Sequence, residues 1–396
     1  MKNRLQKLHT RLCSCAVFRG VLEHPVFSLF GGFCFLDTED DIYAQMDSYA
    51  GFVAEIYEHG GNLTELVKRI VFADENVYIK SIAKEEQINP HIVSSAEREL
   101  KIFAEFAALT ANDFAECMGV EVKEIPVFDS FNADMVTLYK ERLQEIHKHG
   151  YGIFSSYCMF RMSDDKQIEP IASADRIAMD TFIGYELERQ QVIDNTRAFV
   201  ERRPAANTLL CGDAGTGKSS TVKAVANAFF DEGVRLIELR KDQLCYLPYV
   251  MGKISGNPLR FIIFIDDLSF NQNDDNFSML KAALEGSASA KAENAVIYAT
   301  SNRRHIIKES FGDREGDDVH INDTLQETLS LSERFGLTVL FQKPNKQLYL
   351  DIVRRLAQRF DIKMEQKELE IKAEAFALRK GNRSARCAEQ FIESLL

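Results

Sequence analysis

Long apolar runs are missing from this sequence of 396 residues. A membrane-spanning helix needs about 18 or more consecutive apolar residues, and no such run occurs. The chain begins with basic residues, but Arg19, Glu23 and Pro25 interrupt the apolar segment that follows, which is not typical of a signal peptide. We therefore expect a cytoplasmic protein with no membrane partner.

Basic residues are in deficit, because 48 Lys and Arg stand against 60 Asp and Glu, and the net charge is −12. A strongly acidic chain repels the phosphate backbone, which argues against a general nucleic-acid coat protein. A local basic segment at 379–386 leaves nucleic acid as a possible partner, although not the favoured one.

Metal-binding cysteine pairs are also absent. Eight cysteines are scattered along the chain, and Cys13 and Cys15 form a C-x-C pair without a second Cys or His pair at the spacing of a zinc site. We expect reduced thiols, as in most cytosolic proteins, and no zinc centre built on these cysteines.

Length and composition predict more than one domain. Hydrophobic residues make up 45% of the chain and charged residues 27%, which is ordinary for a globular protein, and 396 residues exceed one typical domain. We predict a mainly helical N-terminal domain at 1–150, a hairpin and helical connector at 151–206, an α/β core at 207–343 and a helical lid at 344–396.

The first 150 residues carry apolar side chains at helical spacing, at 41–73 and again at 96–117. Neither a glycine-rich phosphate loop nor a cluster of catalytic residue types occurs in this part of the sequence. We predict a helical bundle there, and its sequence does not indicate an activity.

From residue 207 onward, predicted strands and helices alternate, which is typical of a parallel sheet covered by helices. The predicted strands are 207–211, 234–240, 261–265, 295–300 and 337–342. A hairpin is predicted at 151–172, and helices at 345–360, 366–379 and 383–395.

A phosphate-binding loop is the strongest motif in the chain. The segment GDAGTGKSS follows an apolar strand, precedes a helix and matches G-x-x-x-x-G-K-[ST]. Its glycines allow a turn that aims backbone N–H groups at phosphate oxygens, and the helix presents its positive end to the same anion. We expect Lys218 to reach the β- and γ-phosphates and Ser219 to ligate magnesium. The expected nucleotide-binding residues of the loop are Gly212, Asp213, Ala214, Gly215, Thr216, Gly217, Lys218, Ser219 and Ser220.

Two acidic residues end the predicted strand FIIFI, about 50 residues after the loop. A carboxylate at the end of such a strand can hold magnesium, so Asp266 is the predicted metal residue. The next carboxylate, Asp267, is predicted to orient or activate the attacking water.

Polar positions beside later strands complete the predicted site. Asn302 follows the strand in VIYATS and is expected to hold the lytic water. Arg334 precedes the last strand and is expected to reach the γ-phosphate of a neighbouring subunit, a role worth roughly 10³–10⁵ in rate. In the C-terminal segment GNRSARCAEQF, Arg383 and Arg386 are expected to meet the γ-phosphate from the lid side.

In this order, these motifs resemble those of the AAA+ ATPases: Walker A, a Walker B motif ending in Asp-Asp, sensor 1, an arginine finger and sensor 2. The Asp-Asp ending and the RFGLTV segment resemble the branch that contains bacterial replication initiators and helicase loaders. More closely, TFIGYELERQ, RPAANTLLCGDAGTGKSS, IYATSNRRH and LSERFGL are similar to one bacterial ATP-binding family of unknown function. The similarity extends from about Phe154 to the C-terminus.

The resemblance implies a P-loop NTPase core of the AAA+ type, with ATP and Mg²⁺ as cofactors, a helical lid, homo-oligomers and an unidentified protein partner. It also implies that Gly184 and Tyr185 contact adenine. ATP is preferred to GTP on the resemblance, since no N-K-x-D motif is present. Asp267 stands where many AAA+ enzymes have Glu, and its shorter side chain is expected to slow hydrolysis.

Three other functions remain open on the sequence. A slowly hydrolysing ATP switch or loader that binds a protein partner fits the Asp-Asp ending. A nucleic-acid remodelling ATPase would use Arg303, Arg304 and the basic segment 379–386. A small-molecule kinase would need an acceptor-binding set of residues, which the sequence does not show.

Overall fold

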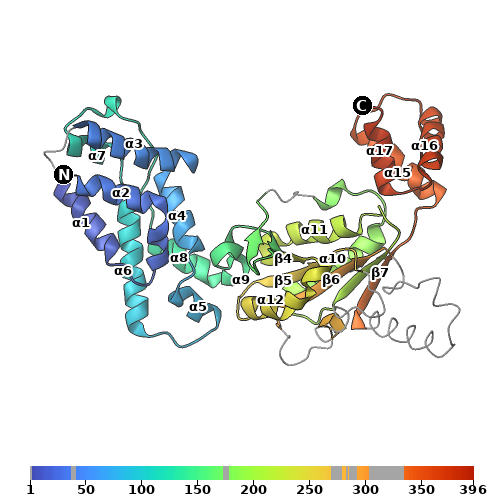
Figure 1. Cartoon of the computed structure of the whole chain (residues 1–396), viewed down its shortest axis with the longest axis horizontal. Helices are drawn as coiled ribbons and strands as arrows, with labels where there is room; N and C mark the ends of the chain where they lie inside the picture. Colours follow the sequence, from blue (N-terminus) through green and yellow to red (C-terminus); the bar gives the residue numbers. More distant parts are fainter. Residues whose placement is uncertain are drawn as a thin grey trace. The chain divides into compact units, whose positions relative to one another are not determined.

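The computed structural model describes residues 2–36, 42–172, 178–268, 279–281, 284, 292–302 and 334–396. The chain forms two compact units, Met1–Ser156 and Tyr157–Leu396, and Figure 1 labels most of their helices and several of their strands. No helix within these ranges combines the length and the apolar character that crossing a membrane requires.

The first unit is helical, as the sequence predicted. The two predicted helical stretches are each divided in two, because Gly60 and Gly61, both at positive φ, end one helix and Thr110 caps the start of another. Its elements are α1 Lys2–Cys13, η1 Arg19–Glu23, α2 Pro25–Phe35, α3 Ile42–Glu58, α4 Leu63–Ala73, α5 Val77–Ala83, α6 Pro90–Ala107, α7 Ala111–Met118, η2 Val122–Glu124, α8 Met135–Gln144, α9 Ile146–His149 and η3 Gly152–Ser155.

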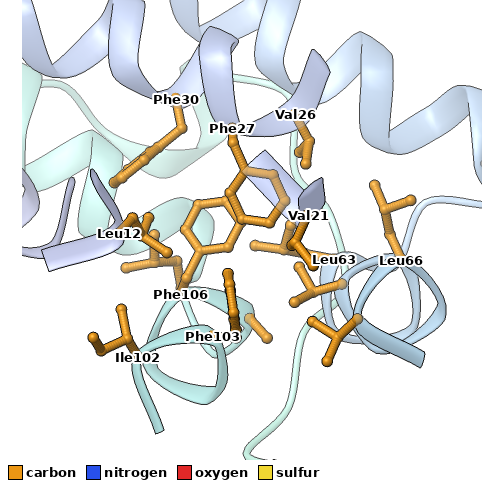
Figure 2. Close-up of a cluster of buried hydrophobic side chains, with 14 of the residues drawn as sticks. Leu12, Val21, Val26, Phe27, Phe30, Leu63, Leu66, Ile102, Phe103 and Phe106 are labelled. Carbon is orange, nitrogen blue, oxygen red and sulfur yellow. The ribbon is translucent and has the colours of Figure 1, made fainter. Parts of the chain in front are cut away.

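Aromatic side chains from several helices fill the core of the first unit. Figure 2 shows Phe27 and Phe30 of α2 lying against Phe103 and Phe106 of α6. The ring centres of Phe27 and Phe106 are 4.9 Å apart, and those of Phe30 and Phe106 are 5.0 Å apart. Such tilted and edge-to-face pairs add to the free energy gained by burying the rings, so they help to hold α2 against α6.

A buried carboxylate holds the chain between α1 and η1. Glu99 of α6 is fully buried and accepts backbone N–H groups from Ala16, Val17 and Phe18 at 2.9–3.0 Å. These donors leave the carboxylate well satisfied, which is the condition for burying a charge. The turn after α1 therefore depends on one side chain more than 80 residues away in sequence.

The second unit is built on a seven-stranded sheet with the order β2-β1-β4-β5-β6-β3-β7. All neighbouring strands are parallel except β1 and β2. Its elements before the C-terminal helices are β1 Met159–Met162, β2 Ile168–Pro170, η4 Met179–Thr181, α10 Glu186–Val200, β3 Thr208–Gly212, α11 Lys218–Ala228, η5 Phe230–Glu232, β4 Val234–Leu239, η6 Lys241–Tyr246, α12 Leu247–Ile254, β5 Arg260–Ile265, β6 Ala295–Ser301 and β7 Leu337–Phe341.

The five strands predicted after residue 207 are all present, and their ends differ from the prediction by one residue at most. Their near-continuous apolar sequences suit a sheet with both faces covered, and α10 and α11 pack on one face. The predicted hairpin is also present as β1 and β2. The sequence did not predict that β1 would pair with β4 and extend the parallel sheet.

Three helices close the chain, close to the predicted positions: α15 Lys346–Arg359, α16 Gln366–Lys380 and α17 Ala385–Glu393. They bury a separate apolar core that contains Tyr349, Val353 and Phe391. Side chains of Asn345, Glu365 and Ser384 cap their N-termini. The predicted fold class is confirmed: an α/β core with a mostly parallel sheet, a helical C-terminal lid and a helical N-terminal part.

Candidate nucleotide site

The glycine-rich loop connects β3 to α11, where the sequence predicted it. Gly212, at φ +137°, allows β7 to pass closely, because a Cβ atom there would lie only 1.9 Å from the carbonyl oxygen of Phe341. Asp213 accepts the backbone N–H of Lys343 at 3.0 Å. The loop is therefore fixed at both its first glycine and its first acidic residue by the strand beside it.

Lys218, the first residue of α11, lies inside the loop. Its Nζ donates to the carbonyl oxygens of Gly212 at 2.9 Å and Asp213 at 2.7 Å, and to Oδ1 of Asn302 at 3.0 Å. Burial lowers the pKa of this lysine, and nearby acidic side chains oppose the shift only in part. The ammonium group is thus a poorly hydrated cation held at the centre of the loop.

Ser219 and Asp266 meet directly at the end of β5. The hydroxyl of Ser219 donates to Oδ1 of Asp266 at 2.6 Å, and the hydroxyl of Thr300 donates to the same oxygen. Hydroxyl and carboxylate oxygens are the ligands that Mg²⁺ prefers. The Ser219 and Asp266 oxygens, which are predicted to hold magnesium, are therefore close enough to bind one ion if they move slightly apart.

Asp267 has a strained backbone that turns it away from the strand, with φ at +51°. Its N–H donates to the Thr300 hydroxyl at 2.9 Å, and its carboxylate accepts the amide of Asn302 at 2.7 Å. Asn302 in turn accepts from Lys218. These side chains form one continuous network along the carboxyl ends of β3, β5 and β6.

A pocket lies beside the loop, between the segment before β3 and the lid. Three parts of the chain form it: residues around η4 and the start of α10, the phosphate loop, and helices α15 and α17. Its lining residues are Thr181, Phe182, Ile183, Tyr185, Arg189, Gly215, Thr216, Gly217, Ser220, Ile352, Leu356, Ala385, Arg386 and Glu389. The phosphate loop supplies polar lining groups, and Phe182, Ile183, Ile352 and Leu356 supply apolar ones, a combination that suits a nucleotide.

The two residues expected to contact adenine have different surroundings. Tyr185 lines the pocket, and its hydroxyl donates to the carbonyl oxygen of Gln342 at 2.7 Å. Gly184 faces the lid instead, since a Cβ atom there would lie 3.1 Å from Cδ1 of Leu348. The glycine thus permits close approach of α15 to this wall of the pocket.

The two lid arginines are also separated. Arg386 lines the pocket, and its backbone N–H donates to the carbonyl oxygen of Gly215 at 3.3 Å. Arg383 forms a two-point ion pair with Glu374 of α16, at 3.0 and 2.9 Å, and is not among the described residues that line the pocket. Within the described part of the chain, Arg386 is the better placed of the two.

Arg334 lies three residues before β7. β7 is parallel to β3, with Phe341 opposite Gly212. Arg334 therefore lies at the amino ends of these strands, whereas the phosphate loop lies at their carboxyl ends. Roughly 15 Å of extended strand separates these two ends. The same subunit's phosphate site is therefore out of its reach. Arg303 and Arg304, and the prediction that they contact nucleic acid, lie outside the described residues.

Sequence reasoning missed Arg189, which is 6% exposed and lines the pocket. Its guanidinium lies 5.3 Å from the ring centre of Phe182, another lining residue, and burial lowers its pKa. The spacing offered a clue, because Arg189 follows Tyr185, the N-cap residue of α10, by four positions and so lies one helical turn beyond it. The bond from Thr300 to Asp266 was also not predicted from the sequence.

Comparison with known proteins places these features in a family. A family model described as "Protein of unknown function (DUF815)" matches residues 155–396. No curated protein matches the chain.

Solved structures with a similar arrangement include RuvB from Thermotoga maritima. A RuvB point mutant aligns at 14% identity and a TM-score of 0.36, over 55% of this chain and 72% of that one. The structure titled as the RuvB Holliday junction branch migration motor aligns at 12% identity and a TM-score of 0.34, over 55% and 71% of the two chains. Likeness at this level does not specify an activity.

Proposed function

Because this chain belongs to the family described as protein of unknown function (DUF815), and because its second unit carries an AAA+ type fold, we propose that it is an ATPase. It binds ATP with Mg²⁺ and hydrolyses it to drive a conformational change in an oligomer or in a partner protein. The supporting observation is the network that joins Lys218, Ser219, Asp266, Asp267 and Asn302 beside the lid pocket.

ATP occupies the pocket with its base and ribose against the wall that contains Tyr185 and its phosphates on the loop. The ammonium group of Lys218 donates to carbonyl oxygens of the loop. When ATP binds, the β- and γ-phosphate oxygens replace these acceptors. A magnesium ion held by Ser219 and Asp266 supplies charge neutralisation for the phosphates. Adenine is preferred because of the family resemblance, and competition with GTP tests that preference.

Water is positioned by Asp267 and Asn302, which already share a hydrogen bond of 2.7 Å. The Asn302 amide also contacts Lys218, so the water-positioning group and the phosphate-binding group are linked. This link couples occupation of the γ-phosphate position to the orientation of Asp267. Arg386 of α17 joins the same site from the lid, through its contact with Gly215.

The position of Arg334 supports an oligomer. Its distance from the phosphate loop of its own subunit supports action on the loop of a neighbour. A complete site then needs two subunits, and turnover depends on assembly.

Magnesium-dependent ATP turnover, measured at rising protein concentration, tests the proposal. Turnover per subunit is expected to climb with concentration and to vanish in Lys218→Ala. The matched control is Lys223→Ala, because Lys223 lies on the same helix but pairs with Glu238 at 3.1 Å outside the loop. Absence of both ATP binding and turnover in the wild-type chain at every concentration refutes the proposal.

A slowly hydrolysing switch is the second candidate, favoured by the short Asp267 side chain at the water-positioning site. Tight ATP binding without turnover at any concentration identifies this case. A nucleic-acid remodeller is expected to produce a salt-dependent gel shift in the presence of ATP, and no shift at low salt removes it.

A further inference from the structure

Two histidines and a glutamate from separate segments meet in the first unit. His24 lies between η1 and α2, and Glu55 and His59 lie near the end of α3. Nδ1 of His24 is 3.9 Å from Oε1 of Glu55, and Nε2 of His59 is 3.4 Å from the same oxygen. One potential ligand atom from each of the three residues lies within 4.8 Å of the other two.

Local structure fixes each member of this group. Glu55 lies in the last turn of α3 and His59 directly follows the helix, so the spacing of four positions places the two side chains next to each other. His24 is the N-cap of α2, directly before Pro25, and its Nδ1 accepts the N–H of Val26 at 3.3 Å. Nδ1 carries a single lone pair in the plane of the ring, so an ion bound at this nitrogen takes the place of the Val26 N–H.

The spacing agrees with the needs of a small transition-metal ion. Zinc binds imidazole nitrogen and carboxylate oxygen at about 2.0–2.2 Å, so tetrahedral ligand atoms are about 3.3–3.6 Å apart. The His59–Glu55 distance already satisfies this, and the His24–Glu55 distance of 3.9 Å requires only a small side-chain rotation. The side chains of His24, Glu55 and His59 are 23%, 15% and 34% exposed, so the group is partly sheltered and reachable from solvent.

We propose that His24, Glu55 and His59 bind a divalent transition ion of the zinc class. Two imidazole nitrogens and one carboxylate oxygen supply three ligands, and solvent takes the fourth position, as in open zinc sites. The ion ties the start of α2 to the end of α3. It therefore stabilises the helical unit independently of the nucleotide site in the second unit.

The test is a zinc titration of the full chain by calorimetry, with magnesium in excess so that the nucleotide site does not take up zinc. One zinc ion is expected to bind per chain. Glu55→Gln and His59→Ala are each expected to lower the affinity at least about tenfold, because each removes one ligand. His91→Ala is the matched control, since His91 is exposed on α6 and outside the group.

Cobalt spectroscopy separates this site from a thiol site. Cys13 lies 3.7 Å from Nε2 of His9 and offers an alternative pair of ligands. Cobalt bound to the proposed site is expected to lack a thiolate charge-transfer band, because its ligands are nitrogen and oxygen. No zinc binding, a thiolate band, or unchanged affinity in either Glu55→Gln or His59→Ala overturns the proposal.

Discussion

Ser219 and Asp266 are 47 positions apart in the chain, yet the serine hydroxyl donates to the aspartate carboxylate at 2.6 Å. The contact joins the helix that follows the phosphate loop to the end of a sheet strand. Thr300 donates to the same carboxylate oxygen, so a third segment fixes its position. An oxygen-rich position of this kind suits magnesium, and it is available only because β3, β5 and β6 are neighbours.

Asp266→Asn is expected to remove most of the gain in nucleotide affinity that magnesium provides, because a neutral amide oxygen is a weaker ligand than a carboxylate. Binding of a fluorescent ATP analogue with and without magnesium measures this gain. We expect it to fall roughly tenfold or more. Asp242→Asn, which alters an exposed partner of Arg240, serves as the control. An unchanged gain in Asp266→Asn removes this residue from the metal site.

Arg334→Ala is expected to lower turnover by roughly 10³–10⁵ without weakening ATP binding. The arginine lies at the amino end of β7, whereas the phosphate loop lies at the carboxyl end of β3. It is therefore expected to act on the phosphate site of a neighbouring subunit. Mixing Arg334→Ala with Lys218→Ala then restores activity, because one variant supplies the loop and the other supplies the arginine. Failure of the mixture to recover turnover above either variant alone contradicts action between subunits.

Gly215→Ala is expected to weaken nucleotide binding by displacing the lid. A Cβ atom there would lie 3.2 Å from Oγ of Ser384 and 3.4 Å from Cβ of Arg386. Gly381→Ala is the matched control, because its φ of +74° is close to the +76° of Gly215 but nothing lies within 4 Å. Both variants carry a backbone cost of about 1–2 kcal/mol. Equal ATP affinities in the two variants would show that α17 does not depend on this contact.

The buried ammonium group of Lys218 predicts a pH dependence of stability. Burial lowers its pKa in the folded protein, whereas an unfolded lysine titrates near 10.5. Between these two pKa values the unfolded chain holds more protons, so the free energy of unfolding rises with pH. The contribution of Lys218 to the free energy of unfolding is complete above the pKa of the unfolded chain. It is lost as the pH falls through the pKa of the folded protein.

Lys218→Met removes that contribution. Urea unfolding of both proteins without nucleotide, from about pH 7.5 to about pH 10, measures it. The stability of the wild-type chain minus that of the variant is expected to increase with pH. A difference that stays constant over this range contradicts a lowered pKa at Lys218.

Glu99→Gln is expected to destabilise the first unit by about 1–3 kcal/mol. The amide can accept through one oxygen only, so at least one of the N–H groups at residues 16–18 loses its partner. The control is Glu97→Gln on the same helix, where the exposed ion pair with Lys140 is screened by solvent and contributes little to stability. Thermal unfolding distinguishes the two, and equal melting temperatures contradict the role given to Glu99.

The sequence predicted the elements of the second unit with little error. Strands such as FIIFI are short apolar runs followed by acidic residues, and helices such as Gln366–Lys380 end at a glycine. These patterns are local, because backbone preference and burial act on neighbouring residues. The break after α3 was missed, although Gly60 and Gly61 mark it in the sequence.

The sequence by itself determined the phosphate loop, since the glycines, Lys218 and Ser219 must be adjacent in the chain for one loop to surround a phosphate. Only the tertiary structure decided which distant groups join them. It placed Arg386 on the pocket while Glu374 paired with Arg383, buried Arg189 against Phe182, and brought His24 to Glu55 and His59. The physical reason is that these contacts depend on how helices and strands pack against each other. The apolar periodicity of one segment predicts which of its faces is buried, but not which other segment covers that face.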